Sequence, residues 1–250
     1  MARLGRSQQF KPKFVRPDLG TVYFDNASTS AYQAALSTYN WTHVIGTNLN
    51  RCLLVGVSIF LTGTVSSIDV SGQAMTFVRA DTNGAYRSEL WQLIAPTSGT
   101  RTITVTLSAS LTSIAGAASW WNVDQTNPLS ANAGGNGTNT PASASVTPGS
   151  TLNRVFGNLA TKTASGVTDQ IRQAPHYSST GALGTGDGSE LGTILTAAST
   201  TIQWDNIGVV DNWAVSLGAL QPPQAVTVVF RRTLSGIVTR TGSRQVHGWA

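Results

Sequence analysis

Few side chains in this sequence of 250 residues have the types and spacing that catalysis needs. The three histidines are His43, His176 and His247, and Cys52 is the single cysteine. A nucleophilic hydrolase needs a serine or cysteine beside a histidine base, and the Gly-x-Ser-x-Gly motif of many such enzymes does not occur in the sequence. His43 lies in a strand-like run, and His247 lies near the C-terminus. We therefore expect no enzymatic activity, and His176 is the only histidine that merits a catalytic test.

Metal and carboxylate chemistry is also weakly supported. A glycosidase needs two facing carboxylates, but the eleven acidic residues are scattered along the chain. The segment Gly186-Asp-Gly-Ser-Glu190 offers oxygen ligands among glycines, but it lacks the alternating acidic pattern of a dedicated calcium loop. We expect a surface loop there, and no metal or cofactor. Cys52 begins an apolar run, which predicts a buried core thiol.

The composition predicts an all-β fold. Charged residues make up only 11% of the chain, with three lysines and two glutamates, so the residues that usually cover helix surfaces are scarce. In Thr102–Ser108, Ile103, Val105 and Leu107 alternate with threonines, which predicts a half-buried antiparallel strand. About nine or ten short strands separated by turn signals predict an antiparallel β-sandwich or jelly roll.

Some segments give stronger structural signals than others. Arg51–Phe60 is apolar on both faces, which predicts a central strand covered on both sides. Ala117–Val123 and Asn212–Leu220 are further expected strands. Ser130–Pro141 is polar and glycine-rich, which predicts a loop. Gly166–Gly192 is the least regular part of the body, and we expect either a functional surface loop or a loop that contains short ordered pieces.

Charge divides the chain into three parts. Residues 1–20 hold five basic residues against Asp18, and 231–250 hold four arginines and no acidic residue, whereas the residues between them are slightly acidic. We expect an extended basic N-terminal arm (1–20), a β-sandwich body (21–222), and a C-terminal strand with a basic tail (223–250). The arm residues expected to contact partners are Arg3, Arg6, Phe10, Lys11, Lys13, Phe14, Arg16, Arg231, Arg232, Arg240, Arg244 and Trp249.

The body resembles a β-sandwich domain of bacteriophage virion and tail-associated proteins. The segments that carry the resemblance are Asn50–Ser58, Leu90–Pro96, Gly99–Thr106, Gly116–Gln125 and Trp213–Leu220. The resemblance implies a fold and a particle context rather than an activity. The basic arms are similar in style to the extensions by which virion proteins bind one another. Trp120-Trp121 stands where the pattern more usually has one aromatic and one small residue, so Trp121 is a possible exposed contact.

These observations lead to a functional hypothesis. We expect a non-enzymatic virion structural protein, made in the host cytoplasm without a signal peptide and without a membrane partner. A capsid decoration (cement) protein is the first choice, binding the major capsid protein or neighbouring tail or connector subunits through its arms. A homo-oligomer is expected, with a trimer favoured. The alternatives are a tail or connector component, or a glycan-binding receptor module of a tail.

The basic ends also raise the question of nucleic acid. Lysine and arginine clusters neutralise phosphates, but the body is not basic and no aromatic-basic surface motif accompanies the ends. An arm that neutralises an acidic protein surface explains the same residues. We therefore expect protein partners and no direct contact with nucleic acid.

Overall fold

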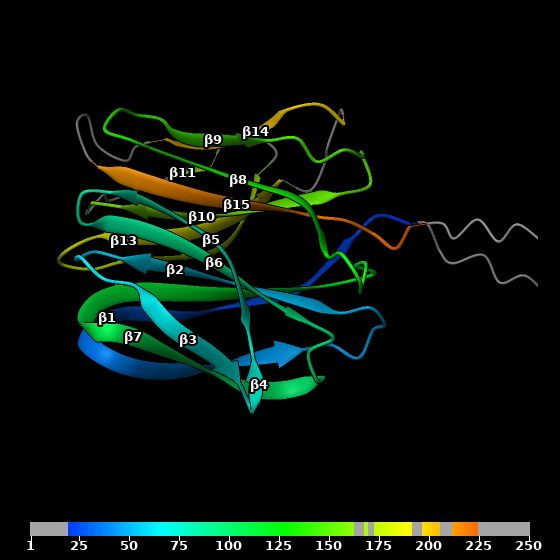
Figure 1. The fold of residues 1–250 in the computed structure, drawn as a ribbon, viewed down its shortest axis with the longest axis horizontal. Helices are drawn as coiled ribbons and strands as arrows, with labels where there is room; N and C mark the ends of the chain where they lie inside the picture. The colour runs from blue at the N-terminus through cyan, green and yellow to red at the C-terminus, as the bar shows by residue number, and fades with distance from the viewer. Residues whose placement is uncertain (1–19, 163–167, 170–172, 192–196, 206–211, 225–250) are drawn as a thin grey trace, which may run out of the picture.

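The computed structural model describes residues 20–162, 168–169, 173–191, 197–205 and 212–224. Within these residues the protein is built from antiparallel β-strands and contains no helix (Figure 1). The prediction of an all-β antiparallel sandwich is confirmed. No helix in the described residues is long and apolar enough to cross a membrane.

The strands form three sheets. The first sheet contains β1 (Tyr23–Ile45), β2 (Cys52–Ile59), β3 (Val65–Val70), β4 (Gln73–Ala74), β5 (Thr76–Asn83), β6 (Tyr86–Ile94) and β7 (Gly99–Trp121). The second contains, in spatial order, β12 (Gln173–Thr180), β13 (Thr185–Leu191), β10 (Arg154–Thr161), β15 (Trp213–Leu220) and β8 (Leu129–Gly137). The third contains β11 (Thr168–Asp169), β14 (Thr200–Asp205) and β9 (Ala142–Val146).

A long, curled ribbon organises the first sheet. β1 and β7 each have 23 residues and pair along almost their whole length. The other edge of β7 pairs with β3 in its first half and with β2 in its second half. Register shifts in β1 between Thr29 and Thr38, with positive φ angles at Ala31 and Ala35, bend the ribbon back on itself (Figure 1).

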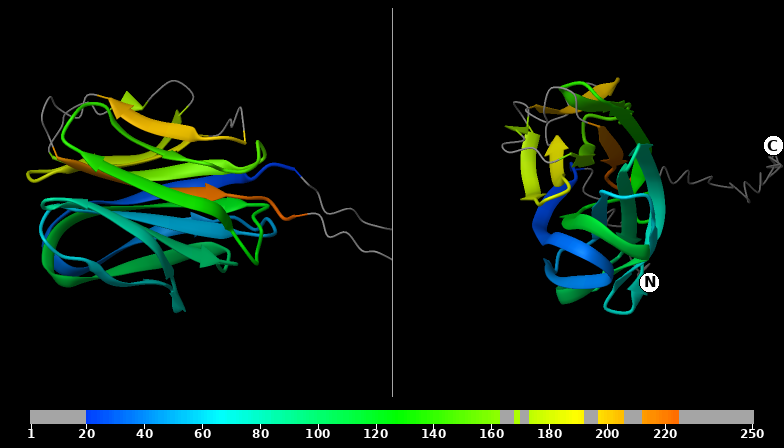
Figure 2. Two further views of the ribbon diagram at one scale, coloured as in Figure 1. Left: turned by 45° about the horizontal axis from the view of Figure 1, so that its top comes forward. Right: turned by 90° about the vertical axis from the view of Figure 1, so that its left-hand side faces the viewer.

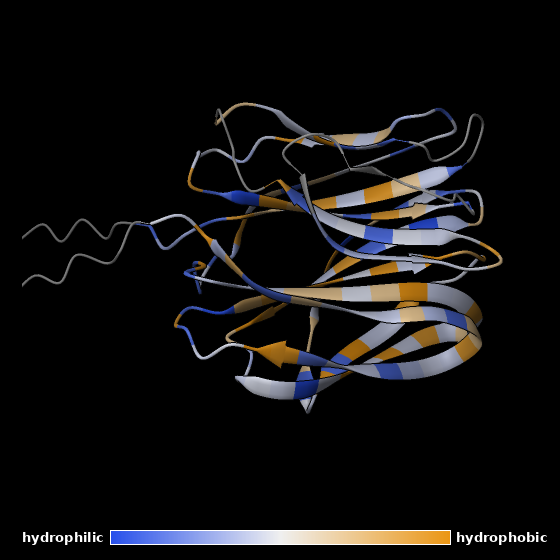
Figure 3. Cartoon of the chain, turned by 180° about the vertical axis from the view of Figure 1, so that it is seen from behind, coloured by the Kyte–Doolittle hydropathy of each residue, from blue (hydrophilic) through white to orange (hydrophobic). Residues whose placement is uncertain are grey.

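The sheets stack as layers with an apolar core in each gap. The curled ribbon and β3 enclose a first core against β2 and β6, which includes Trp41, Leu53 and Ile103. A second core, centred on Trp120 and Phe156, joins the first sheet to the second. A third core fills the gap between the second and third sheets. Figure 2 shows this stacking from other sides, and Figure 3 shows apolar and polar residues alternating along the strands.

The strands with the clearest alternation lie where the sequence predicts. All eight residues of β2 are buried, with Leu53 and Val55 in the first core and Cys52 and Leu54 in the second. The prediction of a central strand covered on both sides is confirmed. Cys52 is buried as expected, and burial raises the pKa of its thiol to about 12, so the thiolate that reactivity needs is not populated at neutral pH.

Two expected strands are parts of one. Thr102–Ser108 and Ala117–Val123 were expected to be separate, yet both belong to the single strand β7, which ends at Trp121. The serine- and alanine-rich stretch between them resembles a connection in sequence. It continues the strand because β1 follows it through the bend with compensating bulges.

The glycine-rich segments are the main correction. Ser130–Pro141 was expected to be a loop, but most of it is β8, which pairs with β15. A Cβ atom at Gly134 would collide with the carboxylate of Asp81, so glycine here permits a close approach between sheets rather than a turn. Much of Gly166–Gly192 likewise forms β12 and β13, two strands of eight and seven residues, rather than the expected loop. The basic arm residues at 1–19 and 225–250 lie outside the described residues.

Candidate functional site

The two ends of the described body are held by one short loop, Asn122–Asp124, which we call the anchor loop. The Asn122 side-chain amide donates to the carbonyl oxygens of Gly20 and Thr21, at 3.0 and 3.1 Å. The Asp124 backbone N–H donates to the Gln221 carbonyl oxygen at 2.8 Å. The two ends of the described body therefore lie at the same end of the molecule, where the blue and orange parts of the ribbon come close together (Figures 1 and 2).

The anchor loop is itself fixed to the body. Asn122 has a positive φ of 58°, and its backbone N–H donates to the Leu49 carbonyl. Val123 is fully buried, and its N–H donates to the Asn50 carbonyl at 2.9 Å. A left-handed residue followed by a buried one turns the chain sharply at the end of β7. The loop thus provides a rigid base for both chain ends.

Asp124 joins the anchor loop to the C-terminal end. Its Oδ1 atom accepts backbone hydrogen bonds from Thr126 and Asn127, each at 2.8 Å, and Oδ2 accepts one from Gln224 at 3.3 Å. Partial burial by itself would raise the pKa of Asp124. The three amide donors outweigh this effect and hold the pKa below its ordinary value. The charged carboxylate is therefore the form that the site stabilises.

Replacing Asp124 by alanine is expected to loosen the anchor. The amide hydrogens of Thr126, Asn127 and Gln224 should exchange with solvent about tenfold faster, because each loses a charged acceptor. Hydrogen exchange followed by NMR measures this directly. Asp69→Ala is the matched control, since Asp69 accepts the Gly72 amide in a distant turn. Unchanged exchange at these three amides in Asp124→Ala would contradict the anchoring role.

The sequence segments that adjoin the two ends of the described body are basic. Residues 1–20 and 225–250 together carry nine basic side chains and one acidic side chain, that of Asp18. Gly20 and Gln224, the described residues that adjoin these segments, both contact the anchor loop. Basic charge strengthens attraction to an acidic partner surface and accelerates encounter.

The adjacent tryptophans point in opposite directions, as expected for neighbours in a strand. Trp120 is fully buried, and its indole N–H donates to Glu190 Oε2 at 2.9 Å. Trp121 is half-buried and stacks on Tyr23, with ring centroids 4.2 Å apart and planes 15° from parallel. Trp121 immediately precedes the anchor loop, so this aromatic pair lies at the candidate interaction face. Its role as a contact remains a prediction.

His176 lies within hydrogen-bond distance of a buried carboxylate. Its Nε2 atom lies 3.1 Å from Glu190 Oε2, and its ring stacks on Phe24 with centroids 4.2 Å apart. Burial by itself would raise the pKa of Glu190, but hydrogen bonds from His176 and Trp120 lower it below the ordinary value. The side chains of both members are less than a tenth exposed, so the pair joins β12, β13 and β7 rather than facing a substrate.

The candidate calcium segment is a strand rather than a loop. Gly186–Glu190 lies in β13 and is buried throughout. Its two carboxylates accept indole N–H groups, Asp187 from Trp204 at 2.7 Å and Glu190 from Trp120. The expectation of a surface loop is wrong because these donors come from distant strands. Among the described residues, no group of three or more His, Cys, Asp or Glu side chains is placed to hold a metal ion.

Sequence reasoning missed a hydrogen-bond chain around His43. Ser28 Oγ lies 2.9 Å from His43 Nδ1, and His43 Nε2 lies 3.1 Å from Ser119 Oγ. Ser119 in turn donates to Asp25 Oδ2 at 2.8 Å, and the Trp41 indole donates to Ser28 Oγ. The His43 ring is 1% exposed and lies inside the curled ribbon. No sequence signal connects these residues, because the bend in β1 brings them together.

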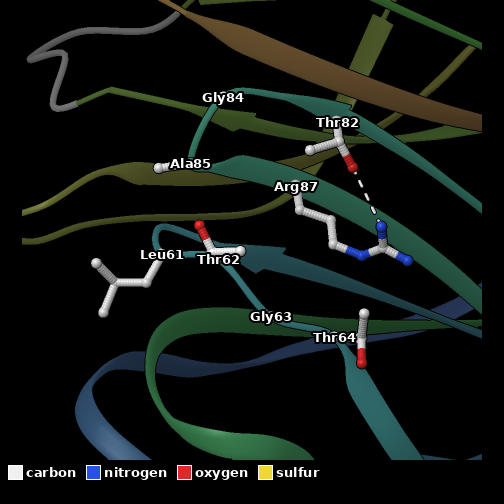
Figure 4. Close-up of a pocket in the computed structure, with 8 residues that line it drawn as sticks. All are labelled: Leu61, Thr62, Gly63, Thr64, Thr82, Gly84, Ala85 and Arg87. Atoms are coloured by element: carbon white, nitrogen blue, oxygen red, sulfur yellow. Dashed lines mark hydrogen bonds between the residues drawn. The ribbon is translucent and has the colours of Figure 1, made fainter.

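A small pocket opens at the end of the molecule opposite the anchor loop (Figure 4). It has a volume of about 220 Å³ and is lined by Leu61, Thr62, Gly63, Thr64, Thr82, Gly84, Ala85 and Arg87. Arg87 is its charged group, but Arg87 Nε donates to Glu89 Oε1 at 2.6 Å, and Nη1 donates to Thr82 at 3.1 Å. Because Glu89 offsets the positive charge, the pocket offers little attraction for an anion.

Comparison of the chain with family models, with curated proteins and with solved structures finds no match. The functional argument therefore depends on the chemistry of the residues and on their arrangement.

Proposed function

We propose that the protein is a non-enzymatic structural component of a bacteriophage particle, most simply a capsid decoration protein. The observation that carries the proposal is the convergence of both chain ends on the anchor loop, through Asn122 and Asp124. The basic segments 1–19 and 225–250 adjoin these two ends in the sequence. The segments bind acidic surfaces of neighbouring subunits, either the major capsid protein or copies of this chain in a trimer.

The body suits the role of a rigid support. Its buried polar side chains join strands and sheets to one another: Ser58 donates to the Leu159 carbonyl, and Ser88 donates to the Asn158 carbonyl, each at 2.8 Å. The contact between His176 and Glu190 and the hydrogen bonds around His43 also join different strands. A body held in this way favours binding by the arms, because little conformational entropy is lost in the body on association.

A tail or connector component would use the same arms and the same body. The two roles differ in the position of the protein in the particle and in its number of copies. Cryo-electron microscopy of intact particles separates them, since a decoration protein lies on the outer capsid lattice and a connector lies on the tail axis.

The arm hypothesis predicts a dependence on charge. Replacing Arg3, Arg6, Lys11, Lys13 and Arg16 together by glutamine is expected to weaken self-association and particle incorporation at least about tenfold, because the electrostatic attraction is lost. Sedimentation velocity at low and high salt measures association, and mass spectrometry of purified particles measures incorporation.

A matched variant exchanges arginine and lysine at the same five positions and thus keeps the charge. It should associate much as the natural protein does, whereas the glutamine variant should not. Incorporation and association equal to those of the natural chain in the glutamine variant would refute the arm hypothesis.

A further inference from the structure

Four uncharged segments meet at the end of the molecule opposite the anchor loop, on the left of Figure 1. They are the bend of β1 (34–37), part of the loop between β2 and β3 (61–64), the bend of β7 (108–110) and the loop between β12 and β13 (181–184). None of the four contains an acidic or basic residue. We call the surface that they form the distal face.

Side-chain contacts join these segments into one surface. Leu36 pairs with Leu111 across the curled ribbon, and a Cβ atom at Gly63 would collide with the Leu111 side chain. A Cβ atom at Gly184 would likewise collide with the ring of Phe60, which immediately precedes segment 61–64. The bends of the ribbon and the two loops are therefore in direct contact.

Three leucine side chains are exposed on the distal face. Leu36, Leu61 and Leu183 are 40%, 40% and 42% exposed, and they are three of the eight large hydrophobic side chains that are exposed in the described residues. Figure 4 shows Leu61 pointing away from the body. Leu183 lies at the tip of a hairpin turn that the hydrogen bond from the Gly181 N–H to the Gly184 carbonyl closes, at 3.0 Å. Exposed apolar groups that gather at one place in the fold indicate an interaction surface.

The distal face also has a cavity, the pocket of about 220 Å³ described above. Leu61 forms part of its wall, together with threonine side chains and Arg87. The Arg87 guanidinium donates through Nε and Nη1 to Glu89 and Thr82, whereas Nη2 has no hydrogen-bond partner among the described residues. The pocket therefore combines an apolar wall with one unused N–H donor. These features suit a leucine side chain that enters beside a main-chain carbonyl group.

We propose that the distal faces of two copies of this chain bind each other about a twofold axis. Leu183 of each copy enters the pocket of the other, and Arg87 Nη2 donates to a main-chain carbonyl of the entering turn. The exposed leucine and the receiving pocket lie on the same face, which is the self-complementarity that a twofold interface requires. Identical molecules with a net charge of +5 repel one another, and an uncharged face is where this repulsion opposes contact least.

The distal face fits other partners less well. A charged protein surface meets no complementary charge in the four segments, and an anionic membrane meets no basic side chain in them. The contact also goes beyond the proposed arm contacts, because Gly20 and Gln224 lie at the opposite end of the body. Three leucines and a small pocket give a weak dimer, with a dissociation constant on the order of 100 µM. The dimer therefore contributes little at the low micromolar concentrations that suffice for the arm contacts.

The test is sedimentation velocity of the full-length chain, from low micromolar to submillimolar concentration, in high salt that screens charge-driven association. We expect a monomer that becomes a dimer as the concentration rises. Leu61→Asp and Leu183→Asp should each weaken the dimer about tenfold or more, because a charge enters an apolar contact. Leu152→Asp is the matched control and should leave the dimer unchanged. Leu152 is 41% exposed and lies beside the anchor loop, where its carbonyl accepts the Val22 N–H.

A cross-link locates the contact. A short bismaleimide should join two copies of Thr62→Cys and should not join two copies of Thr47→Cys, whose position is exposed near the anchor loop. Cys52 is buried and does not compete. The five-glutamine variant of the N-terminal arm should dimerise in high salt as the natural chain does, so failure of the arm hypothesis leaves this result unaffected. The proposal is overturned if the chain stays monomeric at submillimolar concentration or if the dimer survives both aspartate substitutions. Loss of the dimer in the arm variant, or binding of the distal face to phosphatidylcholine vesicles in place of a second copy, also overturns it.

Discussion

Replacing Tyr177 by alanine is expected to lower the free energy of unfolding by about 3–5 kcal/mol, because a large buried ring is removed from a site that cannot collapse. The ring is 5% exposed and fills a slot between Gly116 of β7 and Gly188 of β13. Its hydroxyl donates to Asn158 Oδ1 at 2.8 Å. Urea unfolding followed by tryptophan fluorescence measures the loss. A change smaller than about 1 kcal/mol would mean that the slot is not held rigidly.

Glycine at position 116 gives this prediction a matched second test. A Cβ atom there would collide with the Tyr177 ring, so Gly116→Ala is expected to cost about 2–3 kcal/mol. In the Tyr177→Ala background the same substitution should cost less than about 1 kcal/mol, because the colliding ring is gone. Gly72→Ala is the control: Gly72 has open space around it, so the cost there is that of its positive φ alone, about 1 kcal/mol. Additive costs at positions 116 and 177 would contradict the proposed contact.

The Tyr177 slot also explains which parts of the fold the sequence could predict. Thr102–Ser108 lies within β7, and the expected strand Asn212–Leu220 agrees with β15 to one residue, because large apolar residues alternate in both segments. β8 and β13 were not predicted, because several of their positions are glycines at which a neighbouring side chain approaches closely. Asp81 and Ile114 of the first sheet approach Gly134 and Gly186, and Tyr177 of the adjacent strand approaches Gly188. Glycine in a local sequence pattern usually indicates a turn, whereas in these strands it permits a close approach of a neighbouring side chain. Only the neighbour across the gap, such as Asp81 opposite Gly134, distinguishes the two cases.

Some features of the candidate interaction site could also be predicted from the sequence, and others could not. The charge of the two ends follows from composition, and the opposite directions of Trp120 and Trp121 follow from the geometry of a strand. The meeting of the ends at Asn122 could not be predicted, because the hydrogen bonds there join residues about a hundred positions apart. Such contacts depend on the complete topology, in which β7 ends beside the start of β1. Local patterns contain no information about that pairing.

Several buried polar groups lie where two layers of the fold face each other. Asn158 lies between the first and second sheets, where its side chain exchanges hydrogen bonds with Ser58, Ser88 and Tyr177. A displacement of one sheet over the other would break several of these bonds at once and leave buried groups without partners. We infer that this network sets the register between the sheets, since unpaired buried polar groups are costly. The chain around His43 has the equivalent position within the curled ribbon.

His43 is expected to make the protein sensitive to mild acid. Burial lowers the pKa of the imidazole from 6.5 to about 4, and the attraction of Asp25 only partly opposes this effect. Because the folded pKa lies below the unfolded one, the unfolded chain binds more protons between these values. The stability that the neutral ring contributes is therefore complete above about pH 6.5 and is lost progressively as the pH falls toward 4.

The pH-dependent change in stability that His43 causes can be measured separately from the change that the carboxylates cause. Between about pH 7.5 and pH 5, the natural chain should lose about 2 kcal/mol of stability through His43 alone. Glu190 and Asp124 have lowered pKa values, so their contributions are lost only at more acidic pH. His43→Gln keeps a polar side chain but cannot titrate, so its stability should change by about 2 kcal/mol less over this interval. Urea unfolding at a series of pH values measures the difference. His176 and His247 are present in both proteins, so their titration does not affect the comparison. Equal pH dependence of the free energy of unfolding in the two proteins would contradict a stabilising role of the neutral His43 ring.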